Sequence, residues 1–450
     1  RSPAAQCAAH YNHAMPNAVA VLNVVGLSSS LLPHAPRIAA LGECATLTPV
    51  LPAVTCSVQS SMLTGQPVSG HGVVGNGWFN HEQQEVQFWK QSNKLVDGEK
   101  VWETARKRDA AATCLNMFWW YNMYSSADWS VTPRPQYKAD GRKVPDCYSH
   151  PPELRDALQA TLGQFPLFKF WGPMADIDST RWIAEATKLA HAKHDPTLTL
   201  CYLPHLDYGL QKLGPSHADI PKHVAEVDAV VGDLIDYFHE RDVKVIVVSE
   251  YGIEDCVAGD GAIAPNRVLR EHGLLSVRDE GGHELLDAGA SRAFAVVDHQ
   301  VAHVYHDTHA DLPEFLHCTA TTIDHERAGR TVLVADPGFW FTYDYWPAGD
   351  ESTLPDFANT VDIHRKPGYD PRELFTDRST PAIAWKLLRK KLGFRQLMDV
   401  IPLDTSLVRG THGRVDNPPE LQPVMIGAGY VGETLACTAV RDVILEAMFK

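Results

Sequence analysis

Apolar and polar positions follow two alternating patterns along the chain. Four short, nearly continuous apolar runs are typical of buried strands: AVAVLNVVGL at 18–27, AATCLNMF at 111–118, LTLCYLP at 198–204 and VKVIVVS at 243–249. Between them lie longer segments such as DIPKHVAEVDAVVGDLIDYFHERD at 219–242, where apolar residues recur at helical spacing. The alternation predicts an α/β fold, with a central, mainly parallel sheet and helices on both faces.

We expect the functional residues to lie just after the predicted strands, because ligands of such sheets bind outside the carboxyl ends of the strands. Two stretches interrupt the alternation. Residues 118–180 are rich in aromatic and turn residues, which predicts an irregular insertion over the active face. Residues 276–380 mix short strands with loops, which predicts a lid-like insertion. Neither is clearly a separate domain, so we expect one α/β domain over 1–450.

The charge and hydropathy of the chain argue against two kinds of partner. With a formal net charge of -15 over 450 residues, the surface should repel phosphate backbones, so no nucleic acid partner is expected. The one dense basic stretch, 385–395, has helical spacing and is interpreted as a solvated helix face. No apolar run is long enough to span a bilayer, so no membrane partner is expected either.

The nine cysteines include no CxxC pair and lie mostly within apolar runs, which favours reduced packing thiols. The stretch RSPAAQCAAHYNHAMPNAVAV at the start of the sequence lacks the basic-then-apolar order of a signal peptide. We therefore expect a soluble protein of the cytoplasm, or of an organelle stroma if a transit peptide has been removed.

The stretch TLTPVLPAVTCSVQSSMLTGQPVSGHGVVGN at 46–76 places one threonine between a strand-like run and a helical run. Thr55 follows Pro52 and precedes SVQSSMLTG, so its hydroxyl should lie at a helix N-terminus beside free backbone amides. That position suits a helix cap and also an oxygen that attacks a phosphate. The local pattern alone favours the cap.

The whole stretch resembles the nucleophile region of the alkaline phosphatase superfamily, in its nucleotide pyrophosphatase/phosphodiesterase branch, through the pattern P-x-x-T…TG-x-P-x-x-HG-x-x-x-N. Three further segments follow in the family's order: YLPHLDYGLQKLGPSH, VIVVSEYGI and LVRGTHGRV. The resemblance covers about residues 18–430 and implies an alkaline-phosphatase-like fold. It also implies that Thr55 is the nucleophile and that Asn76 holds a phosphoryl oxygen.

The resemblance further implies two divalent metal ions, zinc in that branch, one beside the nucleophile and one that activates the attacking water. Carried over position by position, the water-activating metal would be held by Asp207, Gln211 and His412. Glu250 and Tyr251 fall where the second metal expects an aspartate and a histidine.

Several of these positions depart from the family's pattern. The first-strand aspartate is replaced by Val25, with Asn23 the nearest polar residue. Gln211 offers a weak neutral oxygen in place of an imidazole, and Tyr251 binds metal well only as a phenolate, whose ordinary pKa is about 10. We therefore expect one firm metal or an altered pair. The oxygen-rich donors would accept manganese or magnesium as readily as zinc.

Other histidines allow weaker predictions. His303, His306 and His309, in HVYHDTHAD, resemble a metal cluster, but local hydrogen bonding is the better interpretation. His205 is a better spare ligand, because alternation along a strand would point it the same way as Asp207.

Candidate substrate-binding residues are Tyr121, Asn122 and Lys169, together with Arg134. They lie in the predicted insertion 118–180. A cationic side chain would complement an anionic substrate, and an aromatic wall could stack a ring. The aromatic block FWWYNMY is more typical of core or lid packing than of a substrate wall.

The sequence therefore predicts a metal-dependent hydrolase of phosphoesters, in particular phosphodiesters or pyrophosphates, that acts on a small phosphorylated metabolite through Thr55. Two alternatives stay open. One is a phosphomutase or another phosphate or phosphonate enzyme on the same fold, and the other is a pseudoenzyme that binds a phosphorylated ligand without turnover. The altered metal positions support the pseudoenzyme. The sequence does not set the natural substrate or the oligomeric state.

Overall fold

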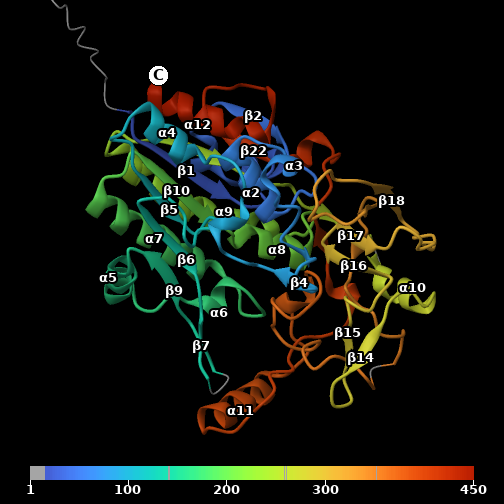
Figure 1. Cartoon of the computed structure of the whole chain (residues 1–450). Helices are drawn as coiled ribbons and strands as arrows, with labels where there is room; N and C mark the ends of the chain where they lie inside the picture. The colour runs from blue at the N-terminus through green and yellow to red at the C-terminus, as the bar shows by residue number, and fades with distance from the viewer. Residues whose placement is uncertain (1–15, 140–141, 258, 260, 351) are drawn as a thin grey trace, which may run out of the picture.

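A nine-stranded sheet forms the centre of the computed structural model, which describes residues 16–139, 142–257, 259, 261–350 and 352–450 (Figure 1). The strand order is β23-β2-β22-β11-β1-β10-β5-β6-β9. The strands are β1 (Val19–Val24), β2 (Cys44–Thr48), β5 (Cys114–Met117), β6 (Trp129–Pro133), β9 (Cys147–His150), β10 (Leu198–Leu203), β11 (Lys244–Val248), β22 (Val424–Ile426) and β23 (Thr434–Ala436). The strands from β11 to β6 run parallel to one another, and β22 and β9 border them antiparallel.

Three neighbouring strands at the middle of the sheet bring their carboxyl ends together. β1 pairs in parallel with β10 on one side and with β11 on the other, so that Asn23 lies opposite Tyr202 and Val248. Every side chain of β1 and β10 is buried, because the sheet is covered on both faces. The segments that follow β10 and β11 therefore start side by side.

Helices cover the two faces of the sheet. One layer contains α1 (Pro36–Ala39), α5 (Pro152–Leu162), α6 (Leu167–Phe170), α7 (Ile177–His194), α8 (His205–Leu213) and α9 (Ile220–His239). The other layer contains α2 (Thr55–Thr64), α4 (Val101–Arg108) and α12 (Val440–Phe449). Helix α7 packs on β5 and β10, α9 packs on β11, and α12 packs on β1 from the opposite side. The predicted α/β fold with helices on both faces is confirmed.

The structure corrects in part the prediction of an irregular insertion over 118–180. Strands β6 and β9 lie in this range and extend the central sheet at one edge, and α5 and α6 follow them. The buried positions of β6 include Ser130 and Thr132. Apolar periodicity therefore gives no strand signal there.

Residues 276–380, which we call the subdomain 276–380, contribute most of a second hydrophobic cluster beside the central sheet (Figure 1), which also includes Phe79, Phe88 and Leu269 from outside this range. Four antiparallel strands pair in the order β16-β17-β19-β18. They are β16 (Ala293–Asp298), β17 (Val301–His306), β18 (Cys318–Thr321) and β19 (Thr331–Ala335). Their buried side chains form a hydrophobic cluster separate from the one around the central sheet.

The remaining elements are short, apart from α11. The strands are β3 (Gly77–Asn80), β4 (Glu85–Phe88), β7 (Gln136–Tyr137), β8 (Lys143–Val144), β12 (Glu254–Asp255), β13 (Ala262–Ile263), β14 (Val277–Asp279), β15 (Glu284–Leu286), β20 (Trp340–Phe341) and β21 (Gly410–Thr411). The α-helices are α3 (Val68–His71), α10 (Pro265–Glu271) and α11 (Thr380–Lys391). The 3-10 helices are η1 (Ser29–His34), η2 (Asn93–Leu95), η3 (Pro371–Leu374), η4 (Thr405–Leu407), η5 (Pro419–Leu421) and η6 (Cys437–Ala439).

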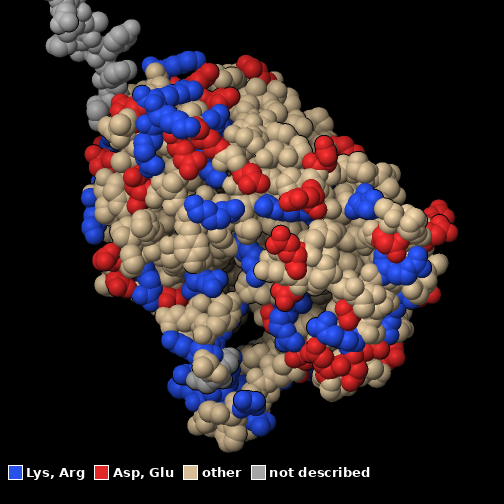
Figure 2. Space-filling view, in the orientation of Figure 1, with Lys and Arg blue, Asp and Glu red and all other residues tan. Residues whose placement is uncertain are grey.

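The predicted basic helix is present as α11, which projects from the rest of the molecule in Figure 1. Figure 2 shows Lys and Arg side chains gathered over it. Its surface also exposes Trp385 and Leu388, so it is solvated but not purely basic. Within the part of the chain that the structure describes, no helix is long and apolar enough to cross a membrane. The eight cysteines of that part are free, as expected for packing thiols, and Cys7 lies outside it.

Candidate active site

Thr55 begins α2 after an extended Val54, and only 5% of its surface is exposed. The cap position is occupied by Val54, and the Thr55 hydroxyl shares a hydrogen bond of 3.1 Å with the hydroxyl of Tyr251. The Tyr251 hydroxyl in turn lies 3.4 Å from Asp207 Oδ1. Either hydroxyl can be the donor of the hydrogen bond between Thr55 and Tyr251.

Asn76 is held against the start of α2. Its Oδ1 accepts the backbone N–H of Cys56 at 3.0 Å, and its Nδ2 donates to Asp298 Oδ1 at 3.0 Å. The backbone N–H of Asn76 donates to the other Asp298 oxygen at 2.7 Å. These bonds fix the orientation of the amide, whose Nδ2 carries a second N–H that can donate to a ligand.

Asp207 and Gln211 lie one turn apart on α8, which begins directly after β10. Gln211 Nε2 donates to Asp207 Oδ2 at 2.8 Å, and Gln211 Oε1 accepts from the hydroxyl of Tyr369 at 2.7 Å. Burial raises the pKa of Asp207 to about 7, against hydrogen bonds from Gln211 and Tyr251. Both polar atoms of the Gln211 side chain are thus engaged in hydrogen bonds.

Glu250 follows β11 and is fully buried. Its Oε1 accepts from Asn23 Nδ2 at 2.5 Å and from Gln59 Nε2 at 2.6 Å, while Oε2 has no partner among the described residues. Burial raises the pKa of Glu250 to about 8, although these amides and the Thr55 hydroxyl oppose the shift. Without a cation nearby, the carboxyl is therefore mostly protonated at neutral pH.

His412 stacks on Tyr251, with ring centroids 3.6 Å apart, and contacts the ring of His299 at 3.8 Å. Its Nδ1 lies 2.8 Å from the carbonyl oxygen of Ala53, so this nitrogen carries the proton. Burial, together with His299, holds the pKa of His412 well below its usual value. Nε2 is left with a lone pair and without a hydrogen-bond partner among the residues described.

The subdomain 276–380 contributes three residues that sequence reasoning missed. Asp298 and His299 follow the apolar part of β16, and His299 Nδ1 lies 2.9 Å from Asp298 Oδ1. Burial raises the pKa of Asp298 to about 6, against hydrogen bonds from Asn76. His299 stacks on Tyr369 at 3.7 Å. Applying the strand-end rule to RAFAVVDHQ would have found Asp298 and His299, but no pattern marks Tyr369.

Two residues of this cluster fit a divalent cation. Asp207 Oδ1 and His412 Nε2 are 3.9 Å apart, a separation that an ion bonded to both at about 2.0 to 2.2 Å can span. At the second position Val25 has no donor atom, and burial raises the pKa of Tyr251 well above its usual value, so the phenol stays protonated. Glu250 keeps one free oxygen. The donor set therefore suits one cation better than a pair.

The predicted substrate-binding residues lie in different settings. Tyr121 is buried against the Cys56 side chain, next to the start of α2. Asn122 donates to two backbone carbonyl oxygens at 2.9 and 3.0 Å. Lys169 forms an ion pair with Asp176 on a partly exposed surface. Of these three, Tyr121 lies beside the Thr55 cluster.

The structure corrects the predicted setting of His205. It lies with Asp207 on the first turn of α8 and not on a strand, because β10 ends at Leu203, just before Pro204. Strand alternation therefore does not orient the two side chains. His303 Nε2 lies 2.9 Å from the carbonyl oxygen of Val74 and His306 Nε2 lies 3.1 Å from the Thr331 hydroxyl, so these partners are distant in sequence and not local. His306 Nδ1 has a local partner, the carbonyl oxygen of Asp307, at 2.8 Å.

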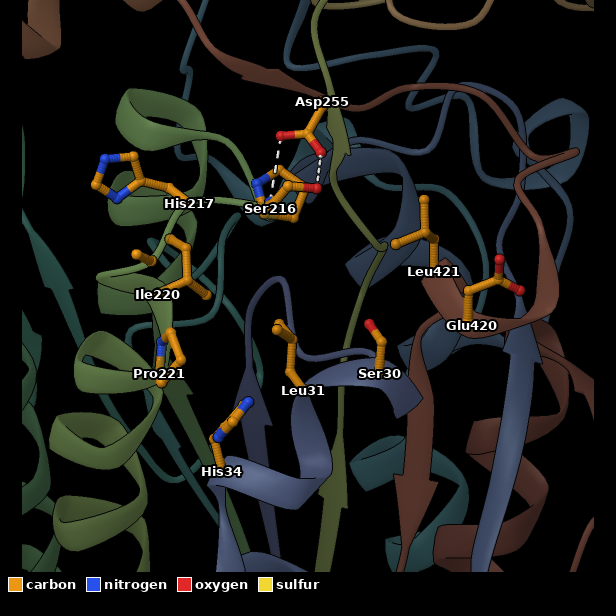
Figure 3. Close-up of a pocket in the computed structure, with 12 residues that line it drawn as sticks. Ser30, Leu31, His34, Ser216, His217, Ile220, Pro221, Asp255, Glu420 and Leu421 are labelled. Atoms are coloured by element: carbon orange, nitrogen blue, oxygen red, sulfur yellow. Dashed lines mark hydrogen bonds between the residues drawn. The ribbon is translucent and has the colours of Figure 1, made fainter.

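The structure also has a cavity of about 480 Å³. Figure 3 shows side chains that line it. It is bounded by η1, by the connection between α8 and α9, and by η5. Among its lining residues are Ser30, Leu31, His34, Ser216 and Asp255, and the Ser216 hydroxyl and backbone N–H both donate to Asp255. None of the cluster residues lines this cavity, so it is a separate feature of the surface.

Known proteins are similar to the chain at the level of family and of fold. The model of the family described as type I phosphodiesterase / nucleotide pyrophosphatase matches residues 19–370. An uncharacterized pyrophosphatase/phosphodiesterase of Schizosaccharomyces pombe is 25% identical over 217 residues, which cover 46% of this chain. The matched region spans only 37% of that relative's own length.

Two solved structures share the fold. Inactive murine ectonucleotide pyrophosphatase / phosphodiesterase 5, in complex with AMP, is 14% identical with a TM-score of 0.57, covering 96% of this chain and 95% of its own. The human protein of that name is 13% identical with a TM-score of 0.56, covering 96% and 94%. The family match spans most of the chain and includes the segments that carry Thr55, Asp207 and Glu250. The chain therefore belongs to the type I phosphodiesterase / nucleotide pyrophosphatase family, a branch of the alkaline phosphatase superfamily.

Proposed function

We propose that the chain is a phosphoester hydrolase in which Thr55 attacks phosphorus, with one divalent cation, zinc or manganese, held by Asp207 and His412. The substrate is a small phosphorylated metabolite with a phosphodiester or pyrophosphate bond. One observation carries the proposal. Hydrogen bonds run from Thr55 Oγ1 through the Tyr251 hydroxyl to Asp207 Oδ1, beside the unpartnered Nε2 of His412.

The start of α2 prepares Thr55 for nucleophilic attack. Backbone N–H groups and the helix dipole at this end favour the negative charge that grows on the oxygen as its proton leaves. The Tyr251 hydroxyl lies 3.1 Å from Thr55 Oγ1, so its hydrogen bond orients the threonine side chain. Tyr251 therefore acts as a positioning residue at the place where the family pattern has a histidine.

Asn76 and the cation would share the charge of the phosphoryl group. The Asn76 amide is held by the Cys56 N–H and by Asp298, so its remaining N–H is fixed in direction before a substrate arrives. When bound, the cation would act as a Lewis acid and lower the pKa of a bound water. Asp207 and His412 would contribute one anionic and one neutral donor to it.

The wall of the site comes from the subdomain 276–380, through Asp298, His299 and Tyr369. The Tyr121 ring lies next to the start of α2, and this position favours a substrate that carries an aromatic ring. The murine neighbour was solved with AMP, so AMP is the first ligand to test for binding.

The test is a set of ester hydrolysis assays with purified protein of measured metal content. Bis(p-nitrophenyl) phosphate, p-nitrophenyl phenylphosphonate, p-nitrophenyl phosphate and p-nitrophenyl sulfate are compared. We expect diester turnover in the wild type, loss of at least about 1000-fold in Thr55→Ala, and partial retention in Thr55→Ser, which keeps a hydroxyl nucleophile. The exposed Thr48→Ala is the matched control and should leave the rate unchanged.

Other outcomes distinguish the alternatives. Diester turnover that survives in Thr55→Ala removes Thr55 as the nucleophile. A preference for the monoester or the phosphonate points to another enzyme on the same fold. Metal-loaded protein that binds AMP but turns over none of the four esters points to a pseudoenzyme.

A further inference from the structure

A second cluster of metal-ligating side chains lies between α8 and α9, outside the Thr55 cluster. These two helices pack side by side (Figure 1). His205 comes from the first turn of α8, and His223 and Glu226 come from α9. Their ligand atoms all lie within 4.8 Å of one another. Hydrogen bonds or a bound ion could each explain such a cluster, and the distances decide between them.

The three distances are too long for good hydrogen bonds. His205 Nε2 lies 3.4 Å from Glu226 Oε2, His223 Nδ1 lies 3.5 Å from His205 Nε2, and His223 Nδ1 lies 3.9 Å from Glu226 Oε2. Hydrogen bonds between nitrogen and oxygen are normally about 2.7 to 3.2 Å long. The three groups therefore face one point without bonding well to each other.

Two of the same distances are close to the edges of a tetrahedral metal site. Ligands about 2.0 to 2.1 Å from a tetrahedral zinc ion are separated from one another by about 3.3 to 3.4 Å. The nearest point equidistant from the three atoms lies in their plane, about 2.1 Å from each of them. A tetrahedral ion can thus enter if His223 and Glu226, which are 3.9 Å apart, close in by about 0.5 Å.

The backbone holds the three ligands in place. His223 and Glu226 are three residues apart on α9, so they share one face of the helix. Helix α8 approaches that face closely, because a Cβ added to Gly209 would lie 3.1 Å from His223 Cγ. His205 is nearly buried, at 4% exposure, whereas His223 and Glu226 are about 30% exposed at the side chain. Water can therefore reach the ion from the α9 side.

We propose that His205, His223 and Glu226 form a binding site for a divalent transition-metal ion, with water as a further ligand. Two imidazoles and one carboxylate are a donor set that zinc uses with a bound water. The ion would clamp the N-terminal turn of α8 to α9. Since Asp207 belongs to the same turn as His205, the clamp would fix the backbone that carries Asp207. The site exists independently of the proposed phosphoester chemistry.

The test counts bound ions and needs no substrate. Chelator-treated full-length protein is titrated with Zn²⁺ in competition with a chromophoric chelator, and with Co²⁺ followed by visible absorption. The variants are His223→Ala, Glu226→Gln, which keeps the side-chain shape, and His412→Ala, which removes the other cation position. His239→Ala, exposed at the end of α9, is the matched control.

We expect His223→Ala and Glu226→Gln to weaken one zinc equivalent by at least about 100-fold, as loss of a direct ligand should exceed the effect of an outer-shell change. The tetrahedral Co²⁺ band should disappear with it, and zinc should no longer raise the melting temperature to the wild-type extent. His412→Ala and His239→Ala should keep this equivalent. The proposal is overturned if His223→Ala binds zinc as the wild type does, or if every bound ion is lost in His412→Ala. A protein that is inactive but still binds this one zinc ion would contradict only the proposed enzymatic function.

Discussion

Replacing Glu250 by glutamine should stabilise the metal-free protein. Glu250 is fully buried, and burial raises its pKa from an ordinary 4.5 to about 8. The folded protein therefore holds a proton on this group over a pH range in which the unfolded chain has lost it. Stability falls as pH rises from about 4.5 to about 8, by about 1.4 kcal/mol per pH unit for one group.

The magnitude at pH 7 follows from the same linkage. Between pH 4.5 and pH 7 the ionisation of Glu250 in the unfolded chain costs the wild type about 3 kcal/mol of folding free energy, an order-of-magnitude value. Glutamine keeps the oxygen that accepts from Asn23 and Gln59, and it cannot ionise. Glu250→Gln should therefore gain about 3 kcal/mol at pH 7 and nothing near pH 4. For a chain of this length that gain corresponds to roughly 3 °C in melting temperature.

The assay is thermal or urea unfolding of chelator-treated protein at several pH values between 4 and 8. Glu82→Gln, at an exposed position, is the control and should follow the wild type. A lower melting temperature for Glu250→Gln at pH 7, or a pH slope equal to that of the wild type, would refute the reasoning. Adding Zn²⁺ tests whether the free Oε2 of Glu250 helps to hold an ion. If it does, the variant loses part of the stabilisation that zinc gives the wild type.

Three further predictions concern other parts of the structure. Arg372→Met should lower the free energy of unfolding by about 3 to 5 kcal/mol in urea, because buried Arg372 donates to Asp344 and Asp370 and the variant leaves both carboxylates without it; a loss below about 1 kcal/mol would contradict this. Gly252→Ala should displace the segment after β11 and remove turnover, because the new Cβ would lie 1.4 Å from the carbonyl oxygen of Leu421. A fully active variant would contradict this prediction, because it would show that the contact relaxes freely. Chelation should abolish diester hydrolysis and added zinc or manganese should restore it, whereas a rate that chelation leaves unchanged argues against the cation at Asp207 and His412.

The central part of the fold was predictable because the sequences of buried parallel strands are continuous apolar runs. The four runs of the sequence contain β1, β5, β10 and β11, and helices separate them. Strand β6, which lies between β5 and edge strand β9, was not predicted, because its buried positions are partly polar. The first turn of α8 was predicted to be part of a strand for a different reason. A strand-like run continues to Leu203 in the sequence, and only Pro204 marks the change to helix.

The candidate site was predictable as far as local motifs reach. Thr55, Asp207, Glu250 and His412 each stand in a short segment with a recognisable neighbour pattern, and the structure brings their side chains into one network of contacts. Tyr369 could not be found in this way. It reaches Gln211 across 158 positions of sequence, and only the packing of the subdomain against α8 brings the two together.

Hydrogen-bonding side chains surround the positions where a cation would otherwise hold charges together, except at Val25, whose side chain forms no hydrogen bond. Asn23 and Gln59 donate to Glu250, and Tyr251 bridges Thr55 and Asp207. A carboxylate left by a departed ion is costly to bury, whereas a protonated carboxyl bonded to two amides is much cheaper. The arrangement supports the proposal of one cation, because neutral hydrogen bonds occupy the second expected position, while the lone pair of His412 and the carboxylate of Asp207 are available at the first.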